Sequence, residues 1–395
     1  MNTSPKRVAA LVTEYRRHSH ADVIVGKILE GYLYDGKEGP NLRVVSMFVD
    51  QFPGGDMSRD LAKKHKFAIT KTIDEALTLG GKNLAVDGVL CIGEHGKYPT
   101  NQRGQILYPR RRFFEEATNT FARVGRSVPV FNDKHLAATW EDGLWMYQRA
   151  RQLFVPLLAG SSLPVTWRRP ALTLPRHCEI VEAVQVGYGP FEGYGFHALE
   201  SLQCMVERRR GGESGVRSVQ CLQGEEMWRA MDRGVFSRTL LEAALARVPA
   251  HAKGDYRQAT QKARDAGVFL IEYRDGLKVA VAMMNGYVHE GDGGAFTFAC
   301  QLRGDKKLLS THFYLQQPDP FAHFSYQLRA IETLIQTGHA PYPVERTLLT
   351  TGVLGAVMIS KSDKNRRVET PYLDIRYQAT DWPYAQDPVP KPIKR

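Results

Sequence analysis

Short and nearly continuous apolar runs alternate with helical spacing in the first third of the chain. The runs are rich in β-branched residues, as buried parallel strands are, and lie at residues 7–13, 42–49, 86–92 and 127–131. Helices are predicted between them at residues 57–65, at 72–80, where Thr72 opens a capping box, and at 111–124. This alternation predicts a doubly wound parallel sheet with helices on both faces.

The pattern changes after the small residues and prolines at 158–164. Strand-like runs at 269–274 and 277–283 flank Asp275-Gly276, which is typical of a type I′ hairpin. Further strands are expected at 297–302 and 308–315, and helices at 196–207, 238–247, 322–337 and 344–360. We therefore predict an α/β protein with a Rossmann-like domain (1–160), an α/β domain with an open, mostly antiparallel sheet (161–382) and a Pro-rich basic tail (383–395).

Composition narrows the class of protein. The 395 residues include 43% hydrophobic side chains, and 53 Lys and Arg against 42 Asp and Glu give a net charge of +11. The basic residues form short clusters without a recognisable nucleic-acid module, so no nucleic-acid partner is expected. No apolar run reaches membrane-spanning length, and five scattered cysteines without C-x-x-C pairs favour a reduced, cytoplasmic protein.

Two motifs stand near the predicted sheet edge. Residues 125–137 (GRSVPVFNDKHLA) join a strand to a polar turn that carries Lys134, and residues 193–199 (GYGFHAL) open a helix with His197. With the element order, they resemble the glucose-fructose oxidoreductase, inositol dehydrogenase and MocA family over nearly the whole chain. The resemblance implies an NAD(P)-dependent sugar or cyclitol oxidoreductase in which Lys134 and His197 are catalytic.

The sequence departs from the family pattern at both motifs. Asp133 and His135 stand where the family has Glu and Pro, and Gly193 replaces an aspartate for which Glu192 and Glu200 are the candidate substitutes. The larger departure is the turn after the first strand, residues 13–20 (TEYRRHSH), which has no glycine. Tyr15 there opposes the usual approach of backbone to pyrophosphate.

We expect NAD(P) to bind in an altered mode, if the family chemistry is kept. Arg16 and Arg17 would hold phosphate through their side chains, with Thr13 beside them. Asp50 ends the second strand, where an acidic residue binds the adenosine ribose in doubly wound folds. Substrate contacts are expected from residues that follow strands or border the second domain: Glu94, His95, Lys97, Tyr98, Tyr194 and Arg168.

A divalent metal is the competing interpretation of the same edge. Carboxylate and imidazole groups suit Zn²⁺ or Mn²⁺, and the candidate ligands are Glu94, His95, Asp133, His135 and His197. The groups come from separate segments, so ordinary polar loop residues explain the pattern equally well.

Three functional hypotheses follow. The first is hydride transfer between NAD(P) and a carbohydrate, with Lys134 and His197 positioning and protonating the reacting oxygen. The second is a nucleotide-independent acid/base enzyme, a lyase, hydratase or epimerase acting on a keto-sugar, with or without metal. The third is a sugar-sensing or scaffold protein. The expected open sheet face also predicts a homodimer or homotetramer.

Overall fold

The first sheet is parallel and has six strands. The structure, a computed structural model, describes residues 4–289, 291–317 and 319–395. The strands are β1 (Lys6–Val12), β2 (Leu42–Val49), β3 (Ala68–Thr70), β4 (Gly88–Ile92), β5 (Val130–Asp133) and β6 (Leu157–Gly160). Their order, β3-β2-β1-β4-β5-β6, is that of a doubly wound sheet and confirms the predicted fold class.

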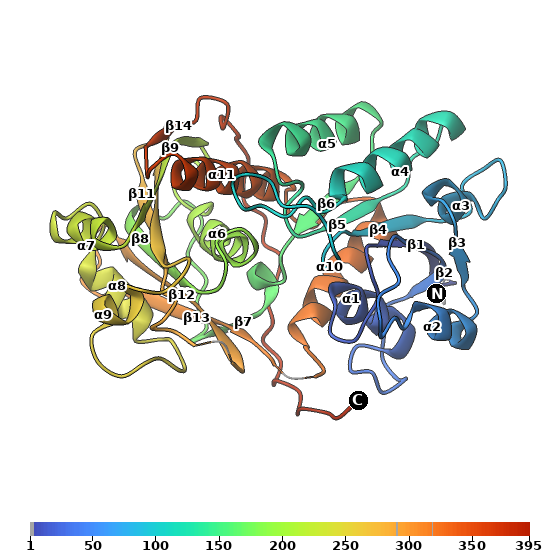
Figure 1. Cartoon of the computed structure of the whole chain (residues 1–395), viewed down its shortest axis with the longest axis horizontal. Helices are drawn as coiled ribbons and strands as arrows, with labels where there is room; N and C mark the ends of the chain where they lie inside the picture. Colours follow the sequence, from blue (N-terminus) through green and yellow to red (C-terminus); the bar gives the residue numbers. More distant parts are fainter. Residues whose placement is uncertain (1–3, 290, 318) are drawn as a thin grey trace.

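Helices cover both faces of this sheet (Figure 1). One face packs against α1 (His20–Glu30), α2 (Ser58–His65) and α10 (His323–Thr337). The other packs against α3 (Ile73–Thr78), α4 (Arg110–Val124) and α5 (Trp140–Gln152). Helix α10 therefore packs on the first sheet, although it follows most strands of the second sheet in sequence. The domain boundary at residue 160 stays a prediction.

The second sheet has eight strands in the order β14-β9-β10-β11-β8-β12-β13-β7 and is mostly antiparallel. These strands are β7 (Trp167–Arg169), β8 (Ile180–Gly187), β9 (Val216–Gln223), β10 (Gly267–Tyr273), β11 (Lys278–Met283), β12 (Gly293–Leu302), β13 (Leu309–Leu315) and β14 (Val368–Glu369). The hairpin at Asp275-Gly276 is confirmed, but the type I′ turn is wrong. Gly276 has a φ of 92°, whereas Asp275 has no positive φ, because four residues separate β10 from β11.

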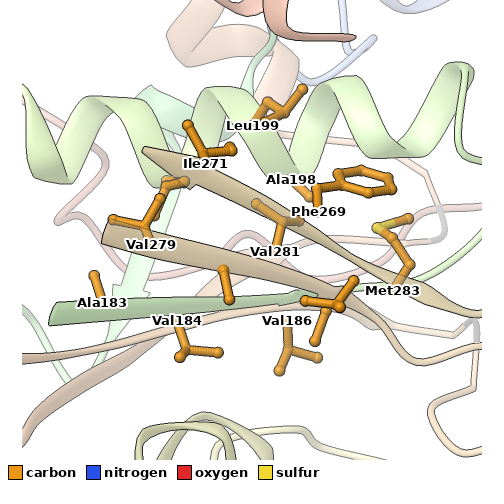
Figure 2. Close-up of a cluster of buried hydrophobic side chains, with 14 of the residues drawn as sticks. Ala183, Val184, Val186, Ala198, Leu199, Phe269, Ile271, Val279, Val281 and Met283 are labelled. Atoms are coloured by element: carbon orange, nitrogen blue, oxygen red, sulfur yellow. The ribbon is translucent and has the colours of Figure 1, made fainter. Parts of the chain in front are cut away.

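Helices also lie on both faces of the second sheet. Figure 2 shows Phe269, Ile271 and Val281 directed toward α6 (Gly193–Val206), and α11 (Glu345–Ser362) packs on the same side against β9. On the opposite side, α8 (Arg238–Leu245) packs against β8, β12 and β13, and α7 (Glu225–Asp232) contacts β9. The sheet is open at its edges β14 and β7, as predicted, but helices pack on both of its faces. The uncovered apolar face expected from the sequence is therefore not found in the described residues, and the homodimer or homotetramer stays a prediction.

Three short elements complete the fold: the 3-10 helix η1 (Leu163–Val165), which joins the two sheets, α9 (Tyr256–Thr260), and the extended segment after β14. None of the helices in the described ranges is long and apolar enough to span a bilayer.

Candidate active site

Four parallel strands of the first sheet deliver polar residues to one edge. Thr13 follows β1, Glu94 follows β4, Lys134 follows β5 and Ser161 follows β6. The carboxyl ends of parallel strands share an edge, which is where open α/β sheets bind ligands. The Thr13 hydroxyl donates to the backbone oxygen of Glu94 at 2.5 Å, so the first two of these turns are joined directly.

A cavity of about 240 Å³ lies at this edge, and residues of the second sheet and of α10 form its opposite wall. Its polar lining includes His18, His20, Glu94, His95, Lys134, Ser162, Tyr194, His197, Gln317 and His323. Its apolar walls include Leu163, Phe296, Leu315, Phe321 and Phe324. The size suits a single sugar or cyclitol ring, and the mixture of aromatic and polar groups is typical of small-molecule sites.

Lys134 and Glu94 form an ion pair within the cavity wall. The Lys134 ammonium lies 3.3 Å from Glu94, whose second oxygen accepts a hydrogen bond from the buried Arg110. Burial disfavours ionisation of Glu94, but the charges of Lys134 and Arg110 outweigh it and hold its pKa well below the usual range. Glu94 is thus a fixed anion that orients Lys134 toward the cavity.

Two histidines of the cavity are each fixed by a hydrogen-bonding partner. His20 Nδ1 lies 2.6 Å from the carboxylate of Asp133, and His197 Nδ1 lies 2.6 Å from the hydroxyl of Ser161. Burial, with the positive charge of Lys134 added, lowers the pKa of His197 well below its ordinary value, so this ring is neutral at pH 7. Because His20 faces a carboxylate and His197 faces a hydroxyl, the two rings differ in which nitrogen can accept or donate a proton.

Four residues that line the cavity have left-handed backbones. His18, His95, Lys134 and Phe321 have φ values of 62°, 72°, 64° and 48°. Such conformations cost non-glycine residues of the order of 1 kcal/mol each and persist where surrounding contacts enforce them. Their gathering around one cavity favours a functional origin for the strain.

The expected adenosine site is occupied by protein side chains. Asp50 accepts a hydrogen bond from the Tyr98 hydroxyl at 2.7 Å and forms an ion pair with Arg112. Gln51 exchanges two hydrogen bonds with the backbone of Lys97, each 2.9 Å long. These contacts pin the turn after β4 onto the end of β2, where a ribose would have to sit.

The turn between β1 and α1 also departs from a phosphate-binding loop. Tyr15 does not obstruct it as the sequence suggested, because its side chain is fully buried beneath α1. A Cβ on Gly26 would lie 3.2 Å from the Tyr15 hydroxyl, so this glycine makes room for the ring. Arg16 is engaged by Glu14 at 2.5 Å and Arg17 by Asp319 at 3.2 Å. Neither arginine is held ready for phosphate.

Dinucleotide chemistry therefore does not fit the residues as they stand. The first turn of α1 carries the buried carboxylate of Asp22, which disfavours an anion where such folds bind pyrophosphate. Asp50, the other expected anchor, already has two protein partners.

The structure brings five of the proposed site residues to the cavity and leaves others elsewhere. Glu94, His95, Lys134, Tyr194 and His197 line it. Lys97 is exposed and Tyr98 faces Asp50. Arg168 instead donates to the Leu172 backbone at 2.8 Å and lies over the Tyr384 ring, in a separate cavity between the second domain and the tail.

The expected metal site does not assemble. Within the described ranges, no group of three or more His, Cys, Asp or Glu side chains is placed to hold an ion. Each acidic candidate has another partner: Glu94 binds Lys134 and Arg110, and Asp133 binds His20. His135 lies 3.1 Å from Arg110 and 3.2 Å from Glu192, and burial lowers its pKa. No metal is proposed.

Sequence reasoning missed the residues that α1 and α10 bring to the cavity. These are His18, His20, Phe321, His323 and Phe324. The His18-Ser19-His20 run was a usable signal, because it lies in the turn between the first strand and α1, where Ser19 is the N-cap. His323 gave no comparable signal, since only the fold places α10 beside α1 and η1.

Comparisons with known proteins agree with this architecture. No family model and no curated protein matches the sequence. Among solved structures, GenD2 from gentamicin A biosynthesis in complex with NAD matches with a TM-score of 0.56 at 15% identity, over 93% of this chain and 97% of that one.

The structures of two inositol dehydrogenases match this chain to a similar degree. The scyllo-inositol dehydrogenase of Lactobacillus casei has a TM-score of 0.57 at 11% identity, over 93% of this chain and 99% of its own. The myo-inositol dehydrogenase of Corynebacterium glutamicum has a TM-score of 0.54 at 14% identity, over 92% and 98%. The resemblance inferred from the two motifs is thus confirmed at the level of the fold: the chain shares its two-sheet fold with these solved dehydrogenases.

Proposed function

We propose that this chain is an enzyme that transfers protons at a carbon next to a carbonyl group in a sugar or cyclitol, as an epimerase or lyase does, without a bound nucleotide. The observation that carries the proposal is the placement of two differently partnered histidines, His20 and His197, around Lys134 in one cavity. The fold shared with inositol dehydrogenases supports a carbohydrate substrate.

His20 is the proposed base. Its Nδ1 donates to Asp133, so Nε2 carries a lone pair and can accept a proton from the substrate carbon. The neighbouring carboxylate stabilises the imidazolium that results, as in other His-Asp pairs.

His197 and Lys134 are proposed to hold the substrate oxygen. Ser161 accepts a hydrogen bond from the Leu163 amide at 3.1 Å, which leaves its hydroxyl hydrogen to donate to His197 Nδ1. His197 Nε2 then bears the ring hydrogen and can donate to a carbonyl oxygen. Lys134 supplies the positive charge that stabilises the enolate formed when the proton leaves.

The enolate can then react in one of two ways. Protonation of the opposite face of the carbon by a water molecule, while His20 releases its proton to solvent, gives an epimer. Loss of a hydroxyl from the next carbon, protonated as it leaves to form water, gives an unsaturated ketone. Both outcomes leave the oxidation state of the enzyme unchanged.

The test is proton exchange in D₂O without nucleotide. A panel of keto-hexoses and keto-inositols is incubated with the protein, and NMR follows loss of the hydrogen beside the carbonyl. We expect exchange that Lys134→Ala slows by about 10²–10³-fold and that Lys97→Ala, at an exposed lysine outside the cavity, leaves intact. Absence of exchange with every substrate, together with nucleotide-dependent oxidation of one of them, would contradict the proposal.

The second candidate is an NAD(P)-dependent sugar oxidoreductase that binds its nucleotide in an altered mode. The likeness to GenD2 in complex with NAD favours it. Titration of NADH and NADPH, followed by nucleotide fluorescence, separates the candidates: saturable binding supports this one, and its absence supports the nucleotide-independent enzyme.

A further inference from the structure

The first turn of α1 holds an arginine side chain at the place where this type of fold binds phosphate. The Arg395 guanidinium meets Asp22 in a two-pronged contact, with nitrogen-oxygen distances of 2.6 and 3.0 Å. It also lies 3.0 Å from Asp319 and stacks 3.7 Å from the centre of the Tyr34 ring. Planar, bidentate contacts of this kind are specific for guanidinium.

The two carboxylates are prepared for a cation. The side chains of Asp22 and Asp319 are 2% and 4% exposed, whereas Arg395 is 18% exposed. The backbone amide of His18 donates to Asp22 at 2.9 Å, and His18 Nε2 lies 3.0 Å from Asp319. The Arg395 guanidinium and the hydrogen bond from His18 hold the pKa of Asp319 below its ordinary range against the cost of burial.

The arginine arrives on an extended segment that crosses from one sheet to the other (Figure 1). Along it, the Ala385 amide donates to Val165 at 2.9 Å, and the Trp167 indole donates to the Asp387 backbone at 2.6 Å. Near its end, the Ile393 amide donates to the Asp319 backbone at 3.0 Å. We call residues 383–395 the strap.

The strap reaches the wall of the cavity through Asp319. That residue immediately precedes the segment 320–324, in which Phe321, His323 and Phe324 line the cavity. His18, another partner of Asp319 besides Arg17, is itself a lining residue. One arginine thus ties together the two segments that α1 and α10 contribute to the cavity.

We propose that Asp22, Asp319 and Tyr34 form a guanidinium-binding clamp, that its ligand is Arg395 of the same chain, and that this contact fixes the α1–α10 side of the cavity. The clamp replaces the phosphate-binding function of this turn with recognition of a cation. The inference does not depend on which substrate the cavity takes or on whether proton transfer occurs there.

The test compares the chain of residues 1–395 with its Arg395→Ala variant, and Arg376→Ala serves as control. Arg376 is a matched arginine because it forms an ion pair with Asp374 on the surface, 73% exposed. We expect Arg395→Ala to lower the thermal midpoint by about 3–6 °C, since it leaves two buried carboxylates short of a partner. Amide hydrogen exchange should rise in segments 18–24 and 319–324, whereas Arg376→Ala should change neither property.

Chemical rescue then tests the ligand class. Methylguanidinium at about 20 mM should restore the midpoint and the protection of Arg395→Ala and leave wild type unchanged, whereas methylammonium should restore neither. The clamp is refuted if Arg395→Ala behaves as Arg376→Ala does, or if methylguanidinium gives no recovery beyond that of methylammonium.

Discussion

Two halves of the same sheet edge differ in what their polar side chains contact. Around β5 and β6, Lys134 and His197 face a cavity, with fixed partners behind them. Around β1 and β2, Asp22 and Asp50 are saturated by other side chains of the protein. The half around β5 and β6, the open half, lines a cavity, whereas in the closed half Asp22 and Asp50, near the strand ends where doubly wound folds bind nucleotides, already have protein partners.

This difference shows that one part of the carboxyl-end edge of a sheet can stay available to a ligand while another part is filled by protein side chains. The polar side chains of the closed half gain internal hydrogen bonds, which removes the cost of burying them without a ligand. Those of the open half keep strained backbones at His95 and Lys134. Strain that contributes nothing to stability is expected where function maintains it.

The largest effect is expected from Lys134→Ala. Removing the charge that faces the developing enolate should lower kcat/KM by about 10²–10³-fold while the fold is retained. Steady-state kinetics on the exchanging substrate measure this, with circular dichroism as the check on folding. Equal activity in wild type and variant would place the chemistry outside this cavity.

Asp133→Asn should follow. The amide still orients His20 but no longer stabilises its imidazolium, so kcat should fall by about 10²-fold. Steady-state kinetics measure the fall, and circular dichroism checks that the variant is folded. A fall in rate that matches a loss of folded protein would assign Asp133 to folding alone.

Acid stability gives a third comparison, because the buried His323 is held neutral. Burial, helped by the charges of Lys27 and His20, lowers its pKa to about 3. The unfolded chain binds this proton near pH 6.5, so its contribution is complete above that pH and is lost as pH falls toward 3. Between pH 6.5 and 5, the unfolding free energy should therefore fall by about 2 kcal/mol less in His323→Gln than in wild type. Urea denaturation at each pH measures this difference.

The smallest effect is expected in the closed half. Asp50→Asn weakens an ion pair with the half-exposed Arg112 and a hydrogen bond from Tyr98, at a cost of about 1 kcal/mol in unfolding free energy. Substrate exchange should stay within about twofold of wild type, as NMR would show. A large loss of activity would return Asp50 to the site and favour the nucleotide-dependent candidate.

Much of the architecture was accessible from the sequence because local signals agreed with it. Buried strands such as β2 and β4 are short and β-branched, and Thr72 caps α3 as the capping box predicted. β8 and β9 were not anticipated from the pattern. The covering of the second sheet by α8 was missed as well, since apolar spacing predicts a buried face but not what buries it.

The candidate site shows the same limit. Lys134 and His197, named from the two motifs, line one cavity together with Glu94 and His95, and their catalytic role stays a prediction. Arg168 and Tyr98 did not, because sequence position gives no direction for a side chain. Tyr15 was expected to obstruct the turn, yet Gly26, eleven positions further along, leaves space for its ring under α1.

By itself, the sequence determined the alternation of strands and helices, the loss of the glycine-rich turn and the residues available for proton transfer. Those properties depend on local spacing and residue type. Only the tertiary structure decided that His20 meets Asp133 across 113 positions and that Arg395 meets Asp22 across 373. Such pairings depend on how the sheets and helices pack, and packing is a property of the whole chain.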